Sequence, residues 1–184
     1  HSLSAFCNGG FCTLPDGFAD PRLFNGNQIF YIVITVLIIA GGIGFPNLVN
    51  FKEAFVEYFR RIKAHIIGKR YIHTIHVYDL NTKLVLVFTL ILFLCGALGF
   101  YIFEFNNSMD GMPVGKRIIQ SAFCSATVRT AGFSTLGPTQ WLSITFLMAV
   151  LLMWIGCSSQ SMGGGIKINA FAAMIFNLRS IVRG

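Results

Sequence analysis

Apolar residues fill long stretches of the chain without a charged residue among them. Three such stretches, 23–51, 84–103 and 130–166, contain no Asp, Glu, Lys or Arg. A helix needs about 20 apolar residues to cross the roughly 30 Å of hydrocarbon in a bilayer. Membrane-embedded backbone must be helical or form a closed barrel, and these runs lack the alternation of barrel strands. The pattern therefore predicts an all-α membrane protein.

Polar and glycine-rich positions divide these stretches into elements. The predicted order is a span over 27–50, a basic connection, a span over 84–103 and a polar stretch over 104–116. A segment over 117–129 follows, too short and too polar to cross, and then a loop and a last apolar run from Trp141. The first residues repeat this order, with a remnant half-helix over 1–7, a loop and a span. We therefore predict three parts: a pore loop with its following helix (1–50), a basic connection (51–83) and a complete helix, pore-loop, broken-helix repeat (84–184).

Two alignments of this repeat compete. Ser4–Cys7 matches Ser121–Cys124 letter for letter, but the distance to the following Gly-Phe pair then differs by about five residues. Anchoring on the loops instead places Asn8–Phe11 on Thr130–Phe133 without a gap. We prefer the gapless alignment, because a half-helix must end at the same distance from the loop that it supports.

Composition and charge place the elements relative to the membrane. Hydrophobic residues make up 54% of the chain and charged residues 11%. Half of the 14 Lys and Arg residues lie between Lys52 and Lys83, and basic residues collect in short cytoplasmic loops. This connection and the chain end near Arg183 are therefore expected inside, with both loops opening to the outside. The net charge of +7 does not indicate nucleic-acid binding, because no soluble module remains to carry it.

Cysteines and histidines give no metal site in the sequence. The five cysteines lack metal-ligand spacing, and we interpret them as small packing residues. His73 and His76 stand three residues apart in the basic connection, but no carboxylate or cysteine completes a ligand set, so we interpret them as solvated.

The two glycine-centred loops carry the candidate chemistry. Non-helical backbone at membrane depth is tolerated only where it is buried in protein or lines a water-filled path. A glycine lets backbone carbonyls turn toward a common axis, and rings of carbonyls replace the hydration shell of a potassium ion. The alternative is that Gly-Phe turns simply end interfacial helices. Two loops in equivalent positions, each followed by a span, favour the pore.

A second candidate lies in the last apolar stretch, where a polar and glycine-rich segment over 156–165 interrupts the run. Three consecutive glycines each cost about 1 kcal/mol relative to alanine in a helix, so a break is expected. Ser158, Ser159, Gln160 and Ser161 should face water or protein, because they are costly in lipid. The alternative is a kinked helix end at the cytoplasmic interface.

Three segments, Thr127–Thr135, Ile39–Pro46 and Ile155–Lys167, resemble the Trk/Ktr/HKT superfamily of potassium transporters, most closely the bacterial Trk-type membrane subunit. The resemblance implies helix, re-entrant pore-loop, helix repeats arranged pseudo-four-fold around one pore. The chain would hold the second pore loop through the third repeat. Because two loops cannot close a four-sided ring, we expect an internal portion of a longer chain, with the remaining repeats outside it.

The resemblance also assigns site residues. The selectivity filter, which would bind potassium as the transported ion, is implied at Asn8, Gly9, Gly10, Phe11, Thr130, Ala131, Gly132 and Phe133. The intramembrane gate is implied at Ser158, Ser159, Gln160, Ser161, Gly163, Gly164 and Gly165. Arg129 and Lys167 would support filter and gate, although Lys167 could equally extend to the inner surface. The sequence departs from the commoner family pattern at Gly9, Cys157, Gln160 and Met162.

The predicted function is potassium uptake through a carbonyl-lined, gated pore, with no bound cofactor. The alternative is a secondary transporter of another cation or small solute, since broken helices also mark such carriers. An enzyme is not expected, because the sequence has no HExxH, GxSxG or intramembrane carboxylate pair. The resemblance implies a bacterial inner membrane, surrounding lipid, a homodimer and a cytosolic ring of nucleotide-binding regulatory domains. Selectivity for potassium over sodium and any ion coupling stay open.

Overall fold

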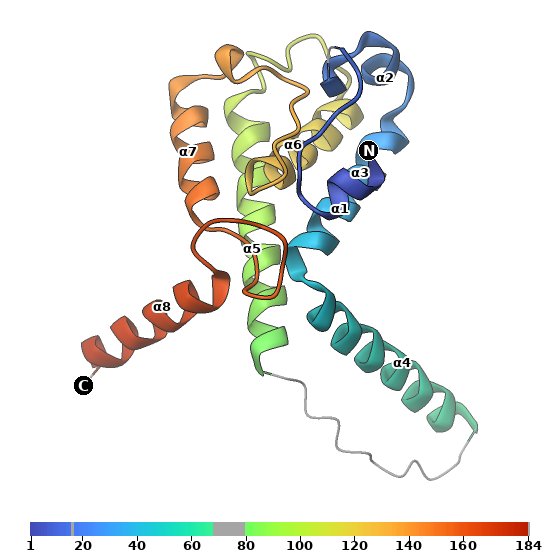
Figure 1. The fold of residues 1–184 in the computed structure, drawn as a ribbon, viewed down its shortest axis with the longest axis vertical. Helices are drawn as coiled ribbons and strands as arrows, with labels where there is room; N and C mark the ends of the chain where they lie inside the picture. Colours follow the sequence, from blue (N-terminus) through green and yellow to red (C-terminus); the bar gives the residue numbers. More distant parts are fainter. Residues whose placement is uncertain (16, 68–79, 184) are drawn as a thin grey trace.

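The computed structural model describes residues 1–15, 17–67 and 80–183, so His73 and His76 lie outside the described residues. Apart from one isolated β-bridge, between Ile155 and Ile166, the regular structure in these ranges is helical (Figure 1). The helices are α1 (Ser2–Phe6), η1 (Gly17–Ala19), α2 (Pro21–Gly26), α3 (Gln28–Ile43), α4 (Phe45–Ile67), α5 (Leu80–Phe103), α6 (Val114–Val128), η2 (Pro138–Gln140), α7 (Ser143–Trp154) and α8 (Ile168–Arg183).

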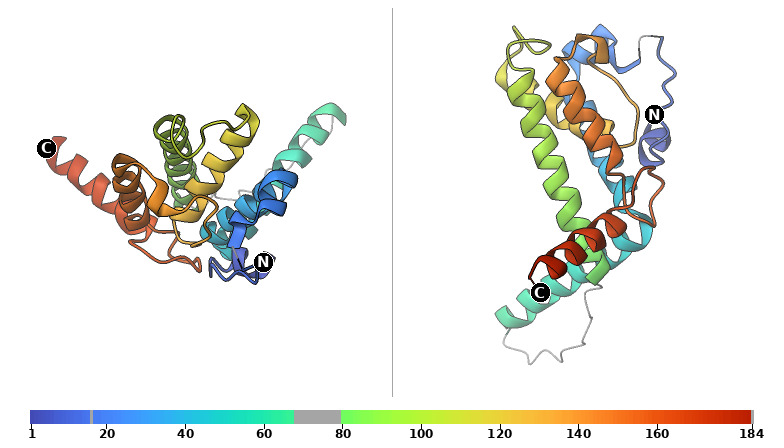
Figure 2. Two further views of the ribbon diagram at one scale, coloured as in Figure 1. Left: turned by 90° about the horizontal axis from the view of Figure 1, so that it is seen from above. Right: turned by 90° about the vertical axis from the view of Figure 1, so that its left-hand side faces the viewer.

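Helix α5 lies along the longest axis of the molecule (Figure 1). Within the described ranges it is the one helix that is long and apolar enough by itself to cross a membrane, over Asn81–Phe103 with a mean hydropathy of 2.6. Figure 1 shows α7 running beside α5, while α4 and α8 leave the lower half of the molecule toward opposite sides. The view from above in Figure 2 shows the same two helices diverging.

The expected first span is a bent pair of helices. Helix α3 ends at Ile43 rather than near Asn50, and α4 continues at 103° to it. Two residues explain the position of the bend. Gly44 adopts a φ of +86°, which favours glycine, and Pro46 lacks the amide needed in a helix interior but is tolerated in a first turn.

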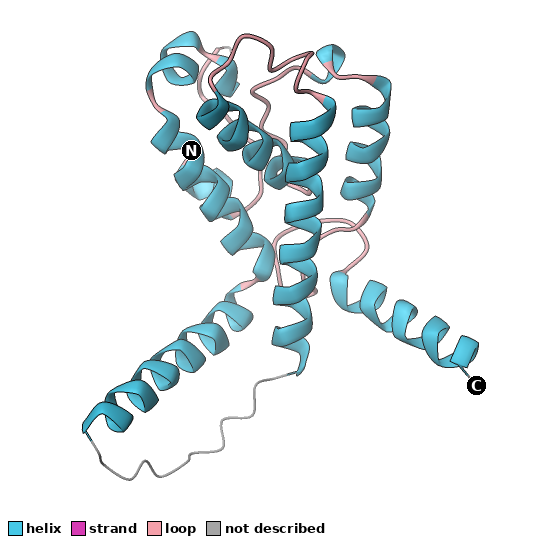
Figure 3. Cartoon of the chain, turned by 180° about the vertical axis from the view of Figure 1, so that it is seen from behind, coloured by secondary structure: helices cyan, strands magenta, loops and turns pink. Residues whose placement is uncertain are grey.

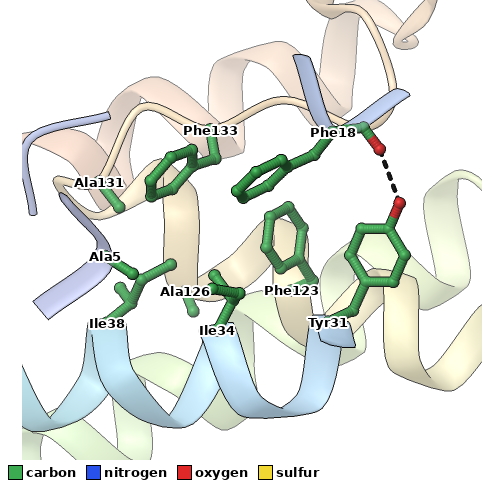
Figure 4. Packing of buried hydrophobic residues seen from close by; sticks show 9 residues of the cluster. All are labelled: Ala5, Phe18, Tyr31, Ile34, Ile38, Phe123, Ala126, Ala131 and Phe133. Atoms are coloured by element: carbon green, nitrogen blue, oxygen red, sulfur yellow. Dashed lines mark hydrogen bonds between the residues drawn. The ribbon is translucent and has the colours of Figure 1, made fainter. Parts of the chain in front are cut away.

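The expected short segment over 117–129 is helix α6, which is held between α3 and α5. Its buried residues run almost without interruption from Gln120 to Val128. Two hydrophobic clusters enclose it. One joins α1, η1, α3 and α6 around Phe18, Tyr31 and Phe123 (Figure 4), and the other joins α5, α6 and α7 around Phe100 and Leu152. Packing on both sides explains how a helix too short to span can be held at one depth.

Candidate functional site

The two glycine-centred loops meet at their backbones. Gly10 has a φ of +69° and Gly132 a φ of +78°. A Cβ atom on Gly10 would lie 2.5 Å from the Ala131 carbonyl oxygen, and one on Gly132 would lie 3.8 Å from the Gly10 Cα atom. The fold therefore brings together segments that are more than a hundred residues apart in the sequence.

The equivalent conformations of Gly10 and Gly132 support the gapless alignment of the repeat. Under the competing alignment, Ser4–Cys7 at the end of α1 would correspond to Ser121–Cys124, which lie inside α6 and well before its end. The four identical residues therefore stand at different distances from the ends of their helices.

Hydroxyl groups tie both loops to the helices that precede them. At the end of α6, the amides of Thr130, Ala131 and Gly132 all lie within 3.3 Å of the Thr127 carbonyl oxygen, to which they donate. The Thr127 hydroxyl donates to the Phe133 carbonyl at 2.7 Å. At the end of α1, the Phe11 amide donates to the Ser4 hydroxyl at 2.8 Å. The chain thus leaves each short helix in a fixed direction.

Arg129 lies behind the loop at the C-terminal end of α6. Its side chain is only 5% exposed, and its Nη1 donates to the Thr89 carbonyl of α5 at 3.4 Å. Together with Thr89, Thr130 and Cys157 it lines a cavity of about 10 Å³. The Arg129 side chain therefore connects the end of α6, where the loop begins, to α5.

The segment Ile155–Lys167, here called the gate segment, connects α7 to α8 without helical structure. It folds back on itself, because Gly156 donates to the Ile166 carbonyl at 3.0 Å and Ile166 donates to the Trp154 carbonyl at 3.1 Å. Side chains would not fit at this crossing: a Cβ atom on Gly165, whose φ is +80°, would lie 2.7 Å from the Gly156 Cα atom. The segment is a folded loop rather than the kinked helix end that the sequence left as an alternative.

The gate segment reaches the loop at the end of α6. The Cys157 sulfur lies 3.3 Å from the Thr130 hydroxyl oxygen, and a Cβ atom on Gly163 would lie 3.1 Å from that same oxygen. The Lys167 ammonium donates to the Gly163 carbonyl at 2.6 Å, so this side chain turns onto the segment instead of extending away from it. Figure 1 shows the segment passing below α6 toward the junction of α3 and α4.

The polar residues of the gate segment divide into two groups. Ser158 is fully buried, and its backbone amide donates to the Gly42 carbonyl at 3.1 Å. Ser159 and Gln160 are exposed, and the Ser161 hydroxyl donates to the Ser158 carbonyl at 2.7 Å. Of the three consecutive glycines, Gly164 has open space around its Cα atom, whereas Gly163 and Gly165 are closely packed.

Two buried groups that our sequence analysis did not assign hold these parts in place. Asn47 is 1% exposed and contacts the gate segment. Glu104 is fully buried and accepts hydrogen bonds from the Leu142 amide at 2.9 Å and the Asn107 side chain at 2.8 Å. A polar side chain within or beside an apolar stretch is the signal that marks both, since such groups are costly without a partner.

The environment of Glu104 favours its charged form. Burial by itself would raise the pKa of Glu104, but the hydrogen bonds that it accepts from Leu142, Ser108 and Asn107 lower it, and the pKa lies below its ordinary value. The carboxylate therefore joins the end of α5 to the start of α7 as a hydrogen-bonded anion.

Known proteins resemble both the sequence and the fold. A family model described as TrkH, cation transport protein, matches residues 1–183. The Ktr system potassium uptake protein B of Vibrio alginolyticus is 32% identical over 174 residues, which cover 94% of this chain and 34% of that protein. The protein of the same name from Bacillus subtilis is 32% identical over 186 residues, covering 100% of this chain and 37% of its own length.

A third relative and a solved structure extend the comparison. The potassium/sodium uptake protein NtpJ of Enterococcus hirae is 28% identical over 185 residues, covering 100% of this chain and 36% of that protein. The crystal structure of the potassium transporter TrkH from Vibrio parahaemolyticus matches with a TM-score of 0.68 at 18% identity, over 100% of this chain and 35% of that one. The chain thus spans about a third of the length of these proteins, and the likeness confirms the predicted all-α membrane fold.

Proposed function

The chain belongs to the TrkH family of cation transport proteins, within the Trk/Ktr/HKT superfamily that its motifs resemble, and on this premise we propose that it forms part of a potassium uptake pathway. One observation carries the proposal: two loops from distant parts of the sequence meet at glycines with positive φ. A membrane protein that brings two such loops together at their backbones has the beginning of a carbonyl-lined ion site.

The proposed filter consists of the residues 8–11 and 130–133, and backbone carbonyls from both loops, other than that of Phe133, take the place of water around the ion. Thr130, Ala131 and Gly132 follow a helix whose C-terminal end carries partial negative charge, which favours a cation. The Phe133 carbonyl accepts the Thr127 hydroxyl and is therefore directed toward α6. We infer that Phe133 supports the proposed filter through the packing of its buried ring.

The proposed gate is the segment below these loops. Its contacts with Thr130, a residue of the proposed filter, support this proposal, and the buried Gly163 allows the backbone to pack closely there. The expected effect of alanine differs between neighbours. Gly165→Ala adds a side chain where the backbone crosses itself and should alter opening, whereas Gly164→Ala has open space and serves as the matched control. Equal potassium flux in both variants would count against a gate.

The complete transporter needs more than this chain. We infer that further repeats close the ring around the pore, that lipid surrounds it and that two copies form a homodimer. In this proposal the connection 51–83 faces the cytoplasm of a bacterial cell and docks a ring of nucleotide-binding regulatory domains. The positive charge of that connection supports this orientation.

Sodium is a second candidate for the transported ion. The relative from Enterococcus hirae carries both ions in its name, potassium and sodium, and it aligns over the whole of this chain. The filter strands outside this chain would decide between the two ions. A secondary transporter for another small solute is favoured less, because the two loops have the same direction in their repeats rather than an inverted one.

Growth at low potassium tests the proposed function. The full-length protein that carries this chain should restore growth to a cell that lacks its own potassium uptake systems. Gly132→Ser should abolish the rescue, whereas Gly111→Ser, at another glycine with positive φ but with open space around it, should preserve it. The proposal would be refuted if the wild-type protein is well expressed but restores no growth at potassium concentrations at which cells with and without their own uptake systems grow differently.

A further inference from the structure

The bend between α3 and α4 is the place where the gate segment rests. The Ser158 amide donates to the Gly42 carbonyl at 3.1 Å, on the last turn of α3. A Cβ atom on Gly44 would lie 2.5 Å from the Gln160 carbonyl oxygen, so the backbone of the segment lies directly on the bend. Figures 1 and 3 show the segment extending from α7 to this junction before it returns to α8.

Asn47, in the first turns of α4, connects the gate segment to two helices at once. Its Nδ2 donates to the Ser158 hydroxyl at 3.0 Å and to the Ile43 carbonyl at 2.8 Å. Its Oδ1 accepts from the Thr82 hydroxyl of α5 at 3.1 Å. Because Asn47, Thr82 and Ser158 are all buried, these bonds are not exchanged readily for bonds to water.

A second asparagine holds the adjoining residue of the segment. The Nδ2 of Asn169, in the first turn of α8, donates to the Ser159 hydroxyl at 2.8 Å and to the Asn81 side-chain oxygen at 2.6 Å. Asn81 and Thr82 are neighbours in α5. Both asparagines therefore tie the gate segment to the same turn of the helix that forms the axis of the fold.

From these contacts we propose that Asn47 and Asn169 are positioning residues whose hydrogen bonds, here called the latch, hold the gate segment in the position that closes the pore. We further propose that the angle between α3 and α4 controls whether the Asn47 bond can form. The inference rests on the proposed potassium pathway. Rotation of α4 about Gly44 moves Asn47 away from Ser158 but leaves the Gly42 carbonyl on α3 where it is. Because most of α4 belongs to the basic connection 51–83, a cytosolic partner bound there would act on the gate through this helix.

The direct test removes the latch from each side. In the full-length protein, Asn47→Leu keeps the approximate size of the side chain and removes its hydrogen bonds, and Ser158→Ala removes the same bond from the segment. Either variant should raise potassium flux in the absence of a regulatory partner by about tenfold, the equivalent of about 1.4 kcal/mol, which is the scale of one buried hydrogen bond. The double variant should exceed neither single variant, because the bond between Asn47 and Ser158 is already lost in each of them.

Asn50→Leu is the matched control. Asn50 lies one turn further along α4 and donates to the same Thr82 hydroxyl, at 3.3 Å, but its bond does not include the gate segment. The ratio of potassium to sodium flux should stay unchanged in Asn47→Leu, because a latch acts below the filter, whereas a merely damaged fold would change the ratio as well. Flux in Asn47→Leu and Ser158→Ala equal to that of Asn50→Leu would overturn the latch, as would additive effects in the double variant.

A distance measurement separates the latch from the potassium pathway itself. Spin labels at Lys52 and Gln160, both exposed, report the position of the segment relative to α4 in a protein whose Cys7, Cys12 and Cys95 are replaced by serine. Asn47→Leu should lengthen or broaden that distance, whichever ion is transported. If wild-type protein fails to carry potassium while this shift occurs, the proposed function fails and the latch stands; an unchanged distance overturns the latch.

Discussion

The two glycine-centred loops share a backbone conformation but differ in what surrounds them. Both have a glycine with positive φ at the same place, and both follow a short helix. Phe133, however, is 4% exposed and stacks on Phe18 with ring centroids 4.5 Å apart, whereas Phe11, its counterpart, is 81% exposed. Figure 4 shows the Phe133 ring beside that of Phe18 in this cluster.

The conformation of each turn and the packing that supports it therefore have separate origins. The turn depends on glycine and on a hydroxyl of the preceding helix, both of which are local in sequence. The support of loop 130–133 comes from α3, α6 and η1, which fall in two different predicted repeats. This loop is thus held partly by elements outside its own predicted repeat, while the Phe11 side chain of loop 8–11 is exposed.

The largest expected effect concerns the two glycines themselves. Gly10→Ala adds a positive-φ penalty and a contact at 2.5 Å with the Ala131 carbonyl, whereas Gly132→Ala adds the penalty with its nearest new contact at 3.8 Å. We expect potassium uptake by the full-length protein to fall about 100-fold for Gly10→Ala and about tenfold for Gly132→Ala, taking about 1.4 kcal/mol for each factor of ten. Uptake at low potassium measures both, with Gly17→Ala as a control at an open positive-φ site. Equal losses would remove the asymmetry between the loops.

Replacing the phenylalanine of each loop by alanine should lower the free energy of unfolding by different amounts. Phe133→Ala empties a buried site and should lower the free energy of unfolding by about 3–5 kcal/mol, whereas Phe11→Ala should lower it by less than about 1 kcal/mol. Thermal unfolding of the full-length protein in detergent measures the two changes side by side. A loss for Phe11→Ala as large as that for Phe133→Ala would show that the remaining chain covers Phe11 as the core covers Phe133.

Removing the hydroxyl groups that hold the two loops should produce a smaller difference in stability between the loops. Thr127→Val leaves the buried Phe133 carbonyl without its donor and should cost about 1 kcal/mol of stability. Ser4→Ala leaves an exposed amide that water can satisfy, so its cost should be a few tenths of a kcal/mol. The same unfolding measurement applies, and a larger effect for Ser4→Ala would mean that the full-length protein buries this bond.

The smallest expected effect is a pH dependence at Glu104, directly after the end of α5. The pKa of Glu104 is lowered in the folded protein, so its contribution to stability is complete above the ordinary carboxyl pKa and is lost as the pH falls through the lowered value. Unfolding temperatures between neutral and acidic pH should therefore decrease less in Glu104→Gln than in wild type. Tyr31→Phe removes a hydrogen bond between uncharged groups, from the Tyr31 hydroxyl of α3 to the Phe18 carbonyl of η1, and should leave the pH slope unchanged. Parallel slopes in wild type and Glu104→Gln would contradict the role assigned to Glu104.

Much of the architecture could be predicted because it depends on local pattern. Uncharged runs indicate helices, so α5 and α7 were expected close to their observed bounds. Consecutive glycines indicate a break, and the segment 155–167 is indeed non-helical. The bend at Gly44 was less predictable, because an apolar run continues through it and the φ of one glycine is invisible in a hydrophobicity pattern.

The partners of the site residues could not be predicted at all. Asn47 and Ser158 are 111 residues apart, and Arg129 meets Thr89 across 40 residues, so no spacing in the sequence relates them. The sequence left two directions open for the Lys167 side chain, and its hydrogen bond to the Gly163 carbonyl shows that the side chain turns back onto the gate segment. The roles of filter, gate and latch remain predictions that the experiments above address.

The order of amino acids was enough to infer the membrane class and most of the places where helices stop. These follow from the cost of charge in lipid and from the backbone freedom of glycine, which are properties of single residues and short runs. Only the tertiary structure decided that loops 8–11 and 130–133 meet, that α6 lies between two cores and that the gate segment rests on the α3–α4 bend. Such contacts depend on how distant surfaces pack together, and packing is a property of the whole fold.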